Sequence, residues 1–500
     1  MAQTNTSQIG ILQTISFIYN VYFHPLSAYP GPLLYRGSDI PKLFQLISGN
    51  DITWTHQLHE KYGSVVRIAP SELSYISAQA WKEIHTSHKG IDPLPLNPMY
   101  GQVEMDHFGA YSTLWQVNLA EHARHRNVLT PAFSNKSLKE QVPIISKYVN
   151  LLVQRMRENA GKTIDLCAWF HFATFDIIGD LAFGEPFDCL EESKFHPWIH
   201  FIITRLRMML YGQVIMGMGI IGVIAKKLMP QRIKDDIAWH VALTIEKVNR
   251  RRKAKTGRQD FMTHILPKVE QPDGLSVGEL YANAQILVMA GSETSATLLA
   301  VMAYYLMKNP DKLRRLQAEV RTAFASEAEI DFATVSKLPY LVAVISESLR
   351  IQPPIPLSIP RFVPHPGATI DGRFVPGGTN LAISQFAAYR SRSNFRDPDR
   401  FVPERWLGEE RYADDNRDVF QPFSLGPRNC IGRHLAQVET RLILARLVWN
   451  FDFELMPDSE AWHVQRTFLL YEKGPLHARL TPVRRESVQV PSIVVEEKAV

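Results

Sequence analysis

The segment between Glu279 and Lys308 constrains the fold of this chain more than any other feature. Glu293 is the only charged side chain between these two residues, and apolar side chains predominate on the other faces that a helix would have here. A helix that is apolar nearly all round is buried, so the segment predicts a long helix inside a large core. Ser276 and Glu279 have the spacing of a capping box at its start, and Pro310 marks its end.

The rest of the pattern indicates one large α-rich domain with minor β structure. Residues 119–350 are mostly helical in their apolar spacing, and 431–449 are helical again. Short strands and hairpins are predicted at 64–78 and 352–387, with a turn at 374–380. The length would allow two or three domains, but no break in composition marks a linker.

The two ends of the chain are predicted to lie outside the main domain. We expect 1–23 to be a membrane anchor or an interfacial helix, because 9–23 is largely apolar but shorter than the ~20 residues that span a bilayer. A proline-rich connector at 24–35 would lead into the domain at 36–483, and 484–500 would be a C-terminal tail. Basic residues after the apolar segment would place the domain in the cytosol.

Composition narrows the functional classes. The chain has three cysteines and no CxxC pair, which is neither a disulfide framework nor a zinc motif, and a reducing compartment fits best. The net charge of +5 is too small to indicate nucleic-acid binding. It suits contact with an anionic membrane or with an acidic partner protein.

Cys430 lies in the most specific motif of the chain, which runs from Phe423 through Gly426 and Arg428 to Gly432. Glycine and proline force a tight loop and a helical run follows, so we expect the sulfur near a helix N-terminus, where a thiolate is stabilised. Such a thiolate suits a soft metal or haem iron. A lone cysteine is more often an inert buried side chain, so the surrounding pattern decides.

That pattern resembles the haem-binding loop of the cytochrome P450 family, F-x-x-G-x-R-x-C-x-G. All five fixed positions of this motif match: Phe423, Gly426, Arg428, Cys430 and Gly432. The resemblance implies that Cys430 ligates the haem iron, that Phe423 packs near the sulfur, and that Arg428 meets a haem propionate. Gly432 would let the following helix pass close to the ring. The implied fold is the cytochrome P450 fold, mainly α with minor β, in which the long buried helix lies over the haem beside small β-sheets.

The long helix carries a second matching site, in which Ala290 and Gly291 are followed by Glu293 and Thr294. It resembles the family's A-G-x-[D/E]-T-[T/S] segment. The resemblance implies that the small pair makes room for oxygen above the iron, and that the acid and the threonine relay protons to it. The alternative is that the hydroxyl groups only satisfy local backbone atoms, although a single buried carboxylate still needs a partner or a purpose.

Glu347 and Arg350, at positions i and i+3, share a helix face and could pair. In the family such a pair locks to an arginine of a later P-E-R-F/W segment, which is Arg405 here. The resemblance therefore implies a buried structural network of these three residues under the haem, with no catalytic role.

The resemblance also implies haem-propionate contacts at His122, Arg126 and Arg361. Arg124 and His125 are then expected to be solvated. The alternative for each residue is a surface cation.

The family's substrate pocket would draw on 108–114, 286–290, 355–359 and 467–468, which are mostly apolar or aromatic. Such walls suit a bulky lipophilic substrate. Ordinary core packing explains any one of these residues equally well.

The resemblance thus implies a haem-thiolate monooxygenase that binds haem b and inserts one oxygen atom from O2 into a lipophilic small molecule. The segments His24-Pro25-Leu26 and 30–32 resemble fungal microsomal members of secondary metabolism, which implies a terpenoid, polyketide or alkaloid pathway. NADPH-cytochrome P450 reductase would supply electrons, because no flavin or nicotinamide module is visible. We expect a monomer at the endoplasmic reticulum membrane that faces the cytosol. Desaturation, ring closure or rearrangement remains an alternative reaction.

Two rival functions follow from the same sequence. Gly217, Gly219 and Gly222 form a G-x-G-x-x-G inside the uncharged segment 208–225, which makes a nicotinamide-dependent dehydrogenase the remote alternative. That site needs a preceding strand and an acidic residue ~20 positions later, whereas the flanks here are helical. Apolar filling, or a loop that dips into the bilayer, explains the segment better. A non-catalytic haem binder would keep the cysteine but would not need the acid–threonine pair.

Overall fold

The structure is a computed structural model, and it describes residues 2–87, 92–97, 105, 107–199, 207–208, 210–212, 227, 230–254 and 257–484. The G-x-G-x-x-G at 217–222 lies outside the described residues, as do most of the apolar segment 208–225 and almost all of the tail at 484–500. The predictions for these segments therefore remain predictions.

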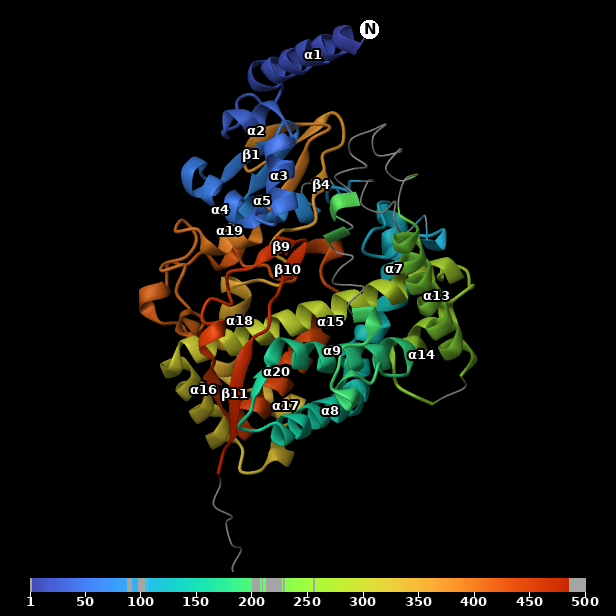
Figure 1. The fold of residues 1–500 in the computed structure, drawn as a ribbon, viewed down its shortest axis with the longest axis vertical. Helices are drawn as coiled ribbons and strands as arrows, with labels where there is room; N and C mark the ends of the chain where they lie inside the picture. Colours follow the sequence, from blue (N-terminus) through green and yellow to red (C-terminus); the bar gives the residue numbers. More distant parts are fainter. Residues whose placement is uncertain are drawn as a thin grey trace, which may run out of the picture.

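The predicted long helix is α15, Val277–Lys308, which crosses the middle of the molecule (Figure 1). The capping box at its start is confirmed: the Ser276 hydroxyl accepts from the Glu279 amide at 3.2 Å, and the Glu279 carboxylate accepts from the Ser276 amide at 2.8 Å. Asn309 ends the helix, and α16, Pro310–Ala323, begins at once because proline is favoured in a first turn.

A second apolar helix, α9, Leu166–Phe183, packs along α15 and is buried over almost its whole length. The core is completed by α8 (Asn135–Glu158), α18 (Pro339–Ile351) and α20 (Arg433–Asn450). Helices α18 and α20 pack against α15, and α8 packs against α9 and α20. Among the described residues, α9 and α15 are long and apolar enough to cross a membrane. Both are mostly buried in protein, so they are core helices.

Further helices surround this core, and α1, Ala2–Tyr22, extends away from the body at the N-terminal end (Figure 1). The others are α2 (Leu33–Gly37), α3 (Ile40–Ser48), α4 (Asp51–Tyr62), α5 (Ala78–His85), α7 (Leu119–Leu129), α10 (Cys189–Glu192), α13 (Gln231–Lys253), α14 (Phe261–Ile265), α17 (Phe332–Val335) and α19 (Gln385–Arg390).

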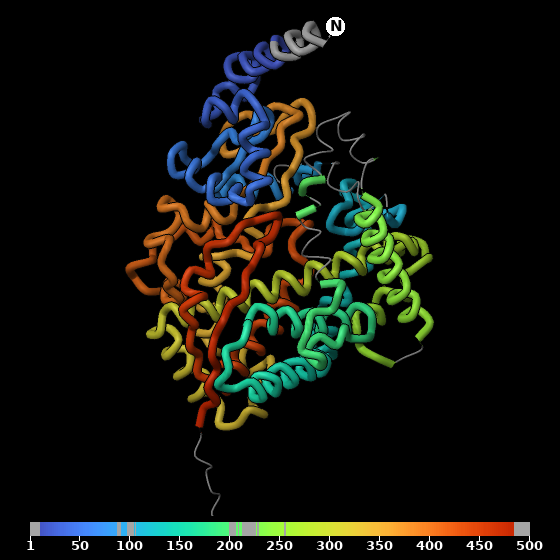
Figure 2. The backbone as a smooth tube through the Cα atoms, in the orientation of Figure 1, coloured from blue at the N-terminus to red at the C-terminus, as the bar shows by residue number. Residues whose placement is uncertain are grey.

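The β structure forms separate small sheets. The four-stranded sheet has the order β1 (Val65–Ala69), β2 (Glu72–Tyr75), β7 (Asn380–Ile383) and β4 (Arg361–Phe362), in which β2 and β7 run parallel. It joins segments that are about 300 residues apart in the sequence, and the tube trace shows their blue and orange colours side by side (Figure 2). The remaining strands are β3 (Thr163–Asp165), β11 (His477–Pro482) and β8 (Phe451–Leu455) in one sheet, and the hairpins β5–β6 (Gly367–Ile370, Arg373–Pro376) and β9–β10 (Arg466–Phe468, Leu470–Glu472).

The predictions for local structure hold with shifts of a few residues. The run at 64–78 contains the β1–β2 hairpin, and a turn lies within 374–380, although β6 and β7 on its two sides pair with different strands. The helix expected at 431–449 begins at Arg433. The chain thus has the predicted mainly α fold with minor β.

Candidate active site

A large cavity of about 2180 Å³ lies between α15, α7 and the loop that carries Cys430. The predicted substrate-side segments contribute Thr113, Leu114, Ile286, Leu287, Ala290, Ile355, Leu357, Ile359 and Thr467 to its walls. These walls are largely apolar, which suits a lipophilic ligand.

The loop before α20 presents Cys430 to this cavity. The Cys430 amide donates to the Phe423 carbonyl at 2.8 Å, which closes the loop around the single 3-10 turn at 426–428. Gly426 has a φ of +72°, and a Cβ there would collide with the carbonyl of His85 at the end of α5. Glycine is therefore required by both the backbone angle and the close approach. At Gly432 a Cβ would come no nearer to the cysteine sulfur than 4.0 Å.

The Cys430 side chain is exposed to the cavity, although protein surrounds it on its other sides. Burial raises the pKa of the thiol, while the Gly432 amide and the Arg126 and Arg433 guanidinium groups act in the opposite direction. The helix contributes less than the sequence suggested, because α20 begins three residues after the sulfur. Metal coordination removes the proton from such a thiol.

The predicted propionate contacts come together in one wall of the cavity. His122, Arg126, Arg361 and Arg428 all line it. Arg126 donates to the carbonyl and the side-chain oxygen of Asn429 at 3.1 and 3.0 Å. Arg361 Nε and Nη1 and Arg428 Nη1 are buried, and none of them has a hydrogen-bond partner in the described part of the chain.

Among the described residues, no carboxylate forms an ion pair with Arg361 or Arg428 in this cationic wall. Burial, followed by repulsion from Arg428, lowers the pKa of Arg361 to about 9, and burial lowers the pKa of Arg428 to about 10. Burial and then Arg428 and Arg126 lower the pKa of His122 to about 3. Buried cations are costly without an anion, so these residues fit the two propionates of a haem.

Sequence reasoning missed one residue of this wall. His85 is 2% exposed, lines the cavity, and holds its Nδ1 atom 3.2 Å from the Trp81 carbonyl. Burial and then Arg361 lower its pKa to about 3. No motif marks it in the sequence, because its position depends on the contact of α5 with the Cys430 loop.

On the α15 side, Ala290, Gly291 and Thr294 line the cavity, and the Thr294 hydroxyl donates to the Ala290 carbonyl at 2.6 Å. The family resemblance implies that Ala290 and Gly291 together make room for oxygen. A Cβ on Gly291 would lie 2.6 Å from Ile178 Cδ1, so the glycine also lets α9 pack closely against α15.

Glu293 faces a different side of α15 from Thr294. Its carboxylate accepts from His171 Nε2 of α9 at 2.7 Å and from Lys473 Nζ, and all three side chains are buried. Burial opposes the charge, but Lys473 and then His171 outweigh it and lower the pKa of Glu293 to about 2. The described cavity wall does not include Glu293, and its carboxylate is engaged by His171 and Lys473, so the predicted proton relay with Thr294 remains a prediction.

Glu347, Arg350 and Arg405 meet in a fully buried network. Arg350 donates to both carboxylate oxygens of Glu347 at 2.8 Å, and Arg405 Nε lies 3.1 Å from the same group. Two members were not predicted. The Trp406 indole donates to Glu347 at 3.0 Å, and Asp415 accepts from Arg405 at 2.5 Å.

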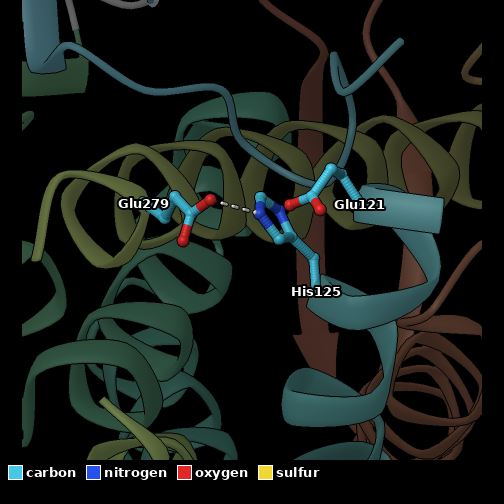
Figure 3. Close-up of side chains that lie close together, drawn as sticks. All are labelled: Glu121, His125 and Glu279. Atoms are coloured by element: carbon cyan, nitrogen blue, oxygen red, sulfur yellow. Dashed lines mark hydrogen bonds and ion pairs between the residues drawn. The ribbon is translucent and has the colours of Figure 1, made fainter. Parts of the chain in front are cut away.

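A group of Glu121, His125 and Glu279 has ligand atoms within 4.8 Å of one another, and Figure 3 shows the three side chains facing each other. Arg124 already supplies a positive charge here, because it donates to Glu121 at 2.7 Å and to Glu279 at 2.5 Å. We interpret the group as an ion-pair link between α7 and the first turn of α15. The expectation that Arg124 and His125 are solvated is wrong, because His125 is fully buried and Arg124 is mostly enclosed.

Glu439 of α20 gives a prediction about pH. The residue is 2% exposed, and burial raises its pKa to about 8, although a hydrogen bond with Ser295 opposes the shift. The folded state therefore favours the protonated form. The stabilisation of the folded state by protonated Glu439 is complete below the ordinary carboxyl pKa, and it is lost as the pH rises through about 8. We expect the unfolding free energy to fall over this interval, by up to ~1.4 kcal/mol per pH unit.

Glu439→Gln should remove that contribution to the slope. The check is denaturant unfolding of wild type and variant across this pH interval. Equal slopes for the two proteins would show that Glu439 does not change its protonation on unfolding.

Comparisons with known proteins agree with this geometry. The family model described as "Cytochrome P450" matches residues 37–478. The chain is 41% identical over 480 residues to cytochrome P450 monooxygenase astA of Talaromyces wortmannii, covering 94% of this chain and 95% of that protein. It is also 41% identical over 486 residues to averantin hydroxylase of Dothistroma septosporum, covering 94% and 90%. The chain therefore belongs to the cytochrome P450 family of haem-thiolate monooxygenases.

Proposed function

We propose that this monooxygenase binds haem b and hydroxylates a lipophilic small molecule of fungal secondary metabolism. The observation that carries the proposal is one cavity that joins the Cys430 sulfur, the apolar walls, and buried Arg361 and Arg428 nitrogens that have no hydrogen-bond partner among the described residues. When bound, the haem activates dioxygen, and its thiolate ligand favours O–O cleavage. The averantin hydroxylase among the relatives supports hydroxylation over desaturation or rearrangement.

The residues of the chain have separate tasks in this proposal. Arg361, Arg428, Arg126 and His122 hold the propionates, which fixes the ring in the cavity. The apolar walls bind the substrate and exclude water. Thr294 holds a proton on its hydroxyl at the cavity surface.

We assign the protein to the endoplasmic reticulum membrane, with the catalytic domain in the cytosol. Apolar side chains of α1 and α3 are exposed: Ile11, Leu12, Ile15, Ile18, Tyr19, Tyr22, Ile40, Phe44 and Ile47. An exposed apolar surface of this extent suits attachment to a lipid bilayer. The net charge of +5 suits docking of an acidic flavoprotein, for which we propose NADPH-cytochrome P450 reductase.

The test of this function is the reduced carbon monoxide difference spectrum of the purified protein, followed by reconstitution with a reductase and NADPH. The long-wavelength Soret band of a haem-thiolate protein and substrate-dependent NADPH consumption are expected. A protein that takes up no haem, or haem that gives no such band, would refute the proposal.

Thr294→Ala should uncouple the reaction. Haem content and NADPH consumption should change little, while product formation falls by ~10²-fold, the lower end of what a positioned proton donor contributes, and hydrogen peroxide accumulates. Thr294→Ser keeps the hydroxyl and should restore product. Full coupling in the alanine variant would contradict the assigned role.

A further inference from the structure

The cavity has a polar wall at its end near α3, α4 and β2. Asp51 and Thr55 lie one turn apart on α4, and both line the cavity. Glu72 and Ser74 are two residues apart on β2 and therefore share a face of the strand, and both also line the cavity. This wall contrasts with the apolar residues that line most of the cavity.

Two of these four side chains are already paired within the protein. Glu72 forms an ion pair with Lys42 of α3, and the Ser74 hydroxyl lies 2.8 Å from His59 Nε2. Asp51 and Thr55 differ from them. In the part of the chain that the structure describes, no side-chain hydrogen bond or ion pair reaches either residue, although Asp51 is 6% and Thr55 2% exposed.

Burial of an unpaired carboxylate and an unpaired hydroxyl is unfavourable. The N-terminus of α4 favours a negative charge at Asp51, but it does nothing for Thr55, which lies one turn further along. Burial raises the pKa of Asp51 to about 6, and of the nearby Lys42–Glu72 ion pair, Lys42 opposes this shift while Glu72 adds to it. The carboxylate is therefore ionised near neutral pH and would gain from a cation.

We propose that Asp51 and Thr55 form a substrate subsite for a protonated amine, so that the preferred substrate class is a lipophilic molecule that carries a basic nitrogen. The proposal rests on the proposed function, because it concerns the substrate of the same cavity. An ammonium group donates several hydrogen bonds, which satisfies the carboxylate and the hydroxyl together.

The subsite lies away from Arg361, one of the proposed propionate contacts. Sheet order places β2 two strands from β4, which carries Arg361. At about 4.8 Å for each spacing, the two strands are ~10 Å apart. An elongated substrate would thus bind its nitrogen at Asp51 while a distant carbon lies at the reacting end of the cavity.

The test uses probes whose binding needs no knowledge of the natural substrate. Imidazoles bind haem iron through nitrogen and shift its absorption spectrum, and an N-alkyl tail extends into the cavity. The probes are two series of 1-alkylimidazoles with matched tail lengths. In one series the tail ends in an ammonium group, and in the other it ends in a methyl group. Tails of roughly 6–12 carbon atoms span the estimated ~10 Å. Dissociation constants come from spectral titration of the haem-bound, full-length protein at neutral pH.

At the optimal tail length, Asp51→Asn should weaken binding of the ammonium probe by ~10-fold, the effect expected for a hydrogen bond to a charged group. Binding of the methyl probe should stay within about twofold of wild type. Thr55→Val should weaken only the ammonium probe, by a smaller factor. Asp236→Asn removes the same charge from an exposed position in the cavity wall on α13 and should change neither.

Equal binding of the ammonium probe to wild type and Asp51→Asn at every tail length would overturn the subsite. A variant of Asp51 that does not fold would also lose the methyl-probe shift, and Thr55→Val would then decide the question by the same comparison. If neither probe shifts the spectrum of the wild type, the proposed haem site fails instead. The two failures are therefore distinguishable.

Discussion

Glu347→Gln is expected to lower the free energy of unfolding by ~3–5 kcal/mol, the range for breaking one partner out of a buried ion pair. The carboxylate accepts hydrogen bonds from Arg350, Arg405, the Trp406 indole and the Val402 amide. Glutamine removes the charge and one acceptor oxygen. Two guanidinium groups would then be buried with less counter-charge than they need.

The effect should extend beyond α18, because the network joins distant parts of the chain. Arg350 also donates to the carbonyls of Tyr389, Pro398 and Arg400, and Arg405 reaches Asp415. These segments precede the loop of Cys430. We therefore expect the variant to be recovered with less bound haem as well as with lower stability.

Denaturant unfolding of the haem-bound protein measures the change. The matched control is Glu454→Gln, which breaks an exposed pair with Arg479 and should change stability by less than ~1 kcal/mol. A loss of similar size in both variants would mean that the buried network contributes no more than a surface pair.

Local sequence patterns predicted the features that depend on neighbouring residues. The apolar composition and the capping box of α15 are patterns of neighbouring residues, and so is the glycine–proline turn shortly before Cys430. These patterns gave the buried helix and the cysteine loop. The sequence predicts the start of α20 two residues early, because Ile431 and Gly432 are compatible with a helix but still belong to the loop.

Long-range pairing was not predictable in this way. Apolar burial of α15 indicated that Glu293 needs a partner, but its partners come from α9 and from the segment after β10. The pairing of β2 with β7 is unpredictable for the same reason, because strand partners so far apart in the sequence leave no signal in either strand. Asp51 and Thr55 carry no signal in the sequence for a similar reason, because only the folded cavity brings them together at its wall.

Loss of the thiolate should have the largest effect on activity. Cys430→Ser is expected to reduce monooxygenase activity below detection, because a serine hydroxyl is not deprotonated near neutral pH and supplies no soft sulfur ligand. The cationic wall of Arg361, Arg428 and His122 remains intact, so the variant should still take up haem.

The reduced carbon monoxide spectrum separates these two effects. In Cys430→Ser we expect haem absorption without the long-wavelength Soret band, since that band reports the thiolate ligand. Cys167→Ser is the matched control, because Cys167 is buried in α9 and burial raises the pKa of its thiol far above the usual range. It should keep both the band and the activity. If Cys430→Ser kept the band, another residue would have to be the ligand. If it lost all haem, the thiolate and not the cationic wall would dominate haem retention.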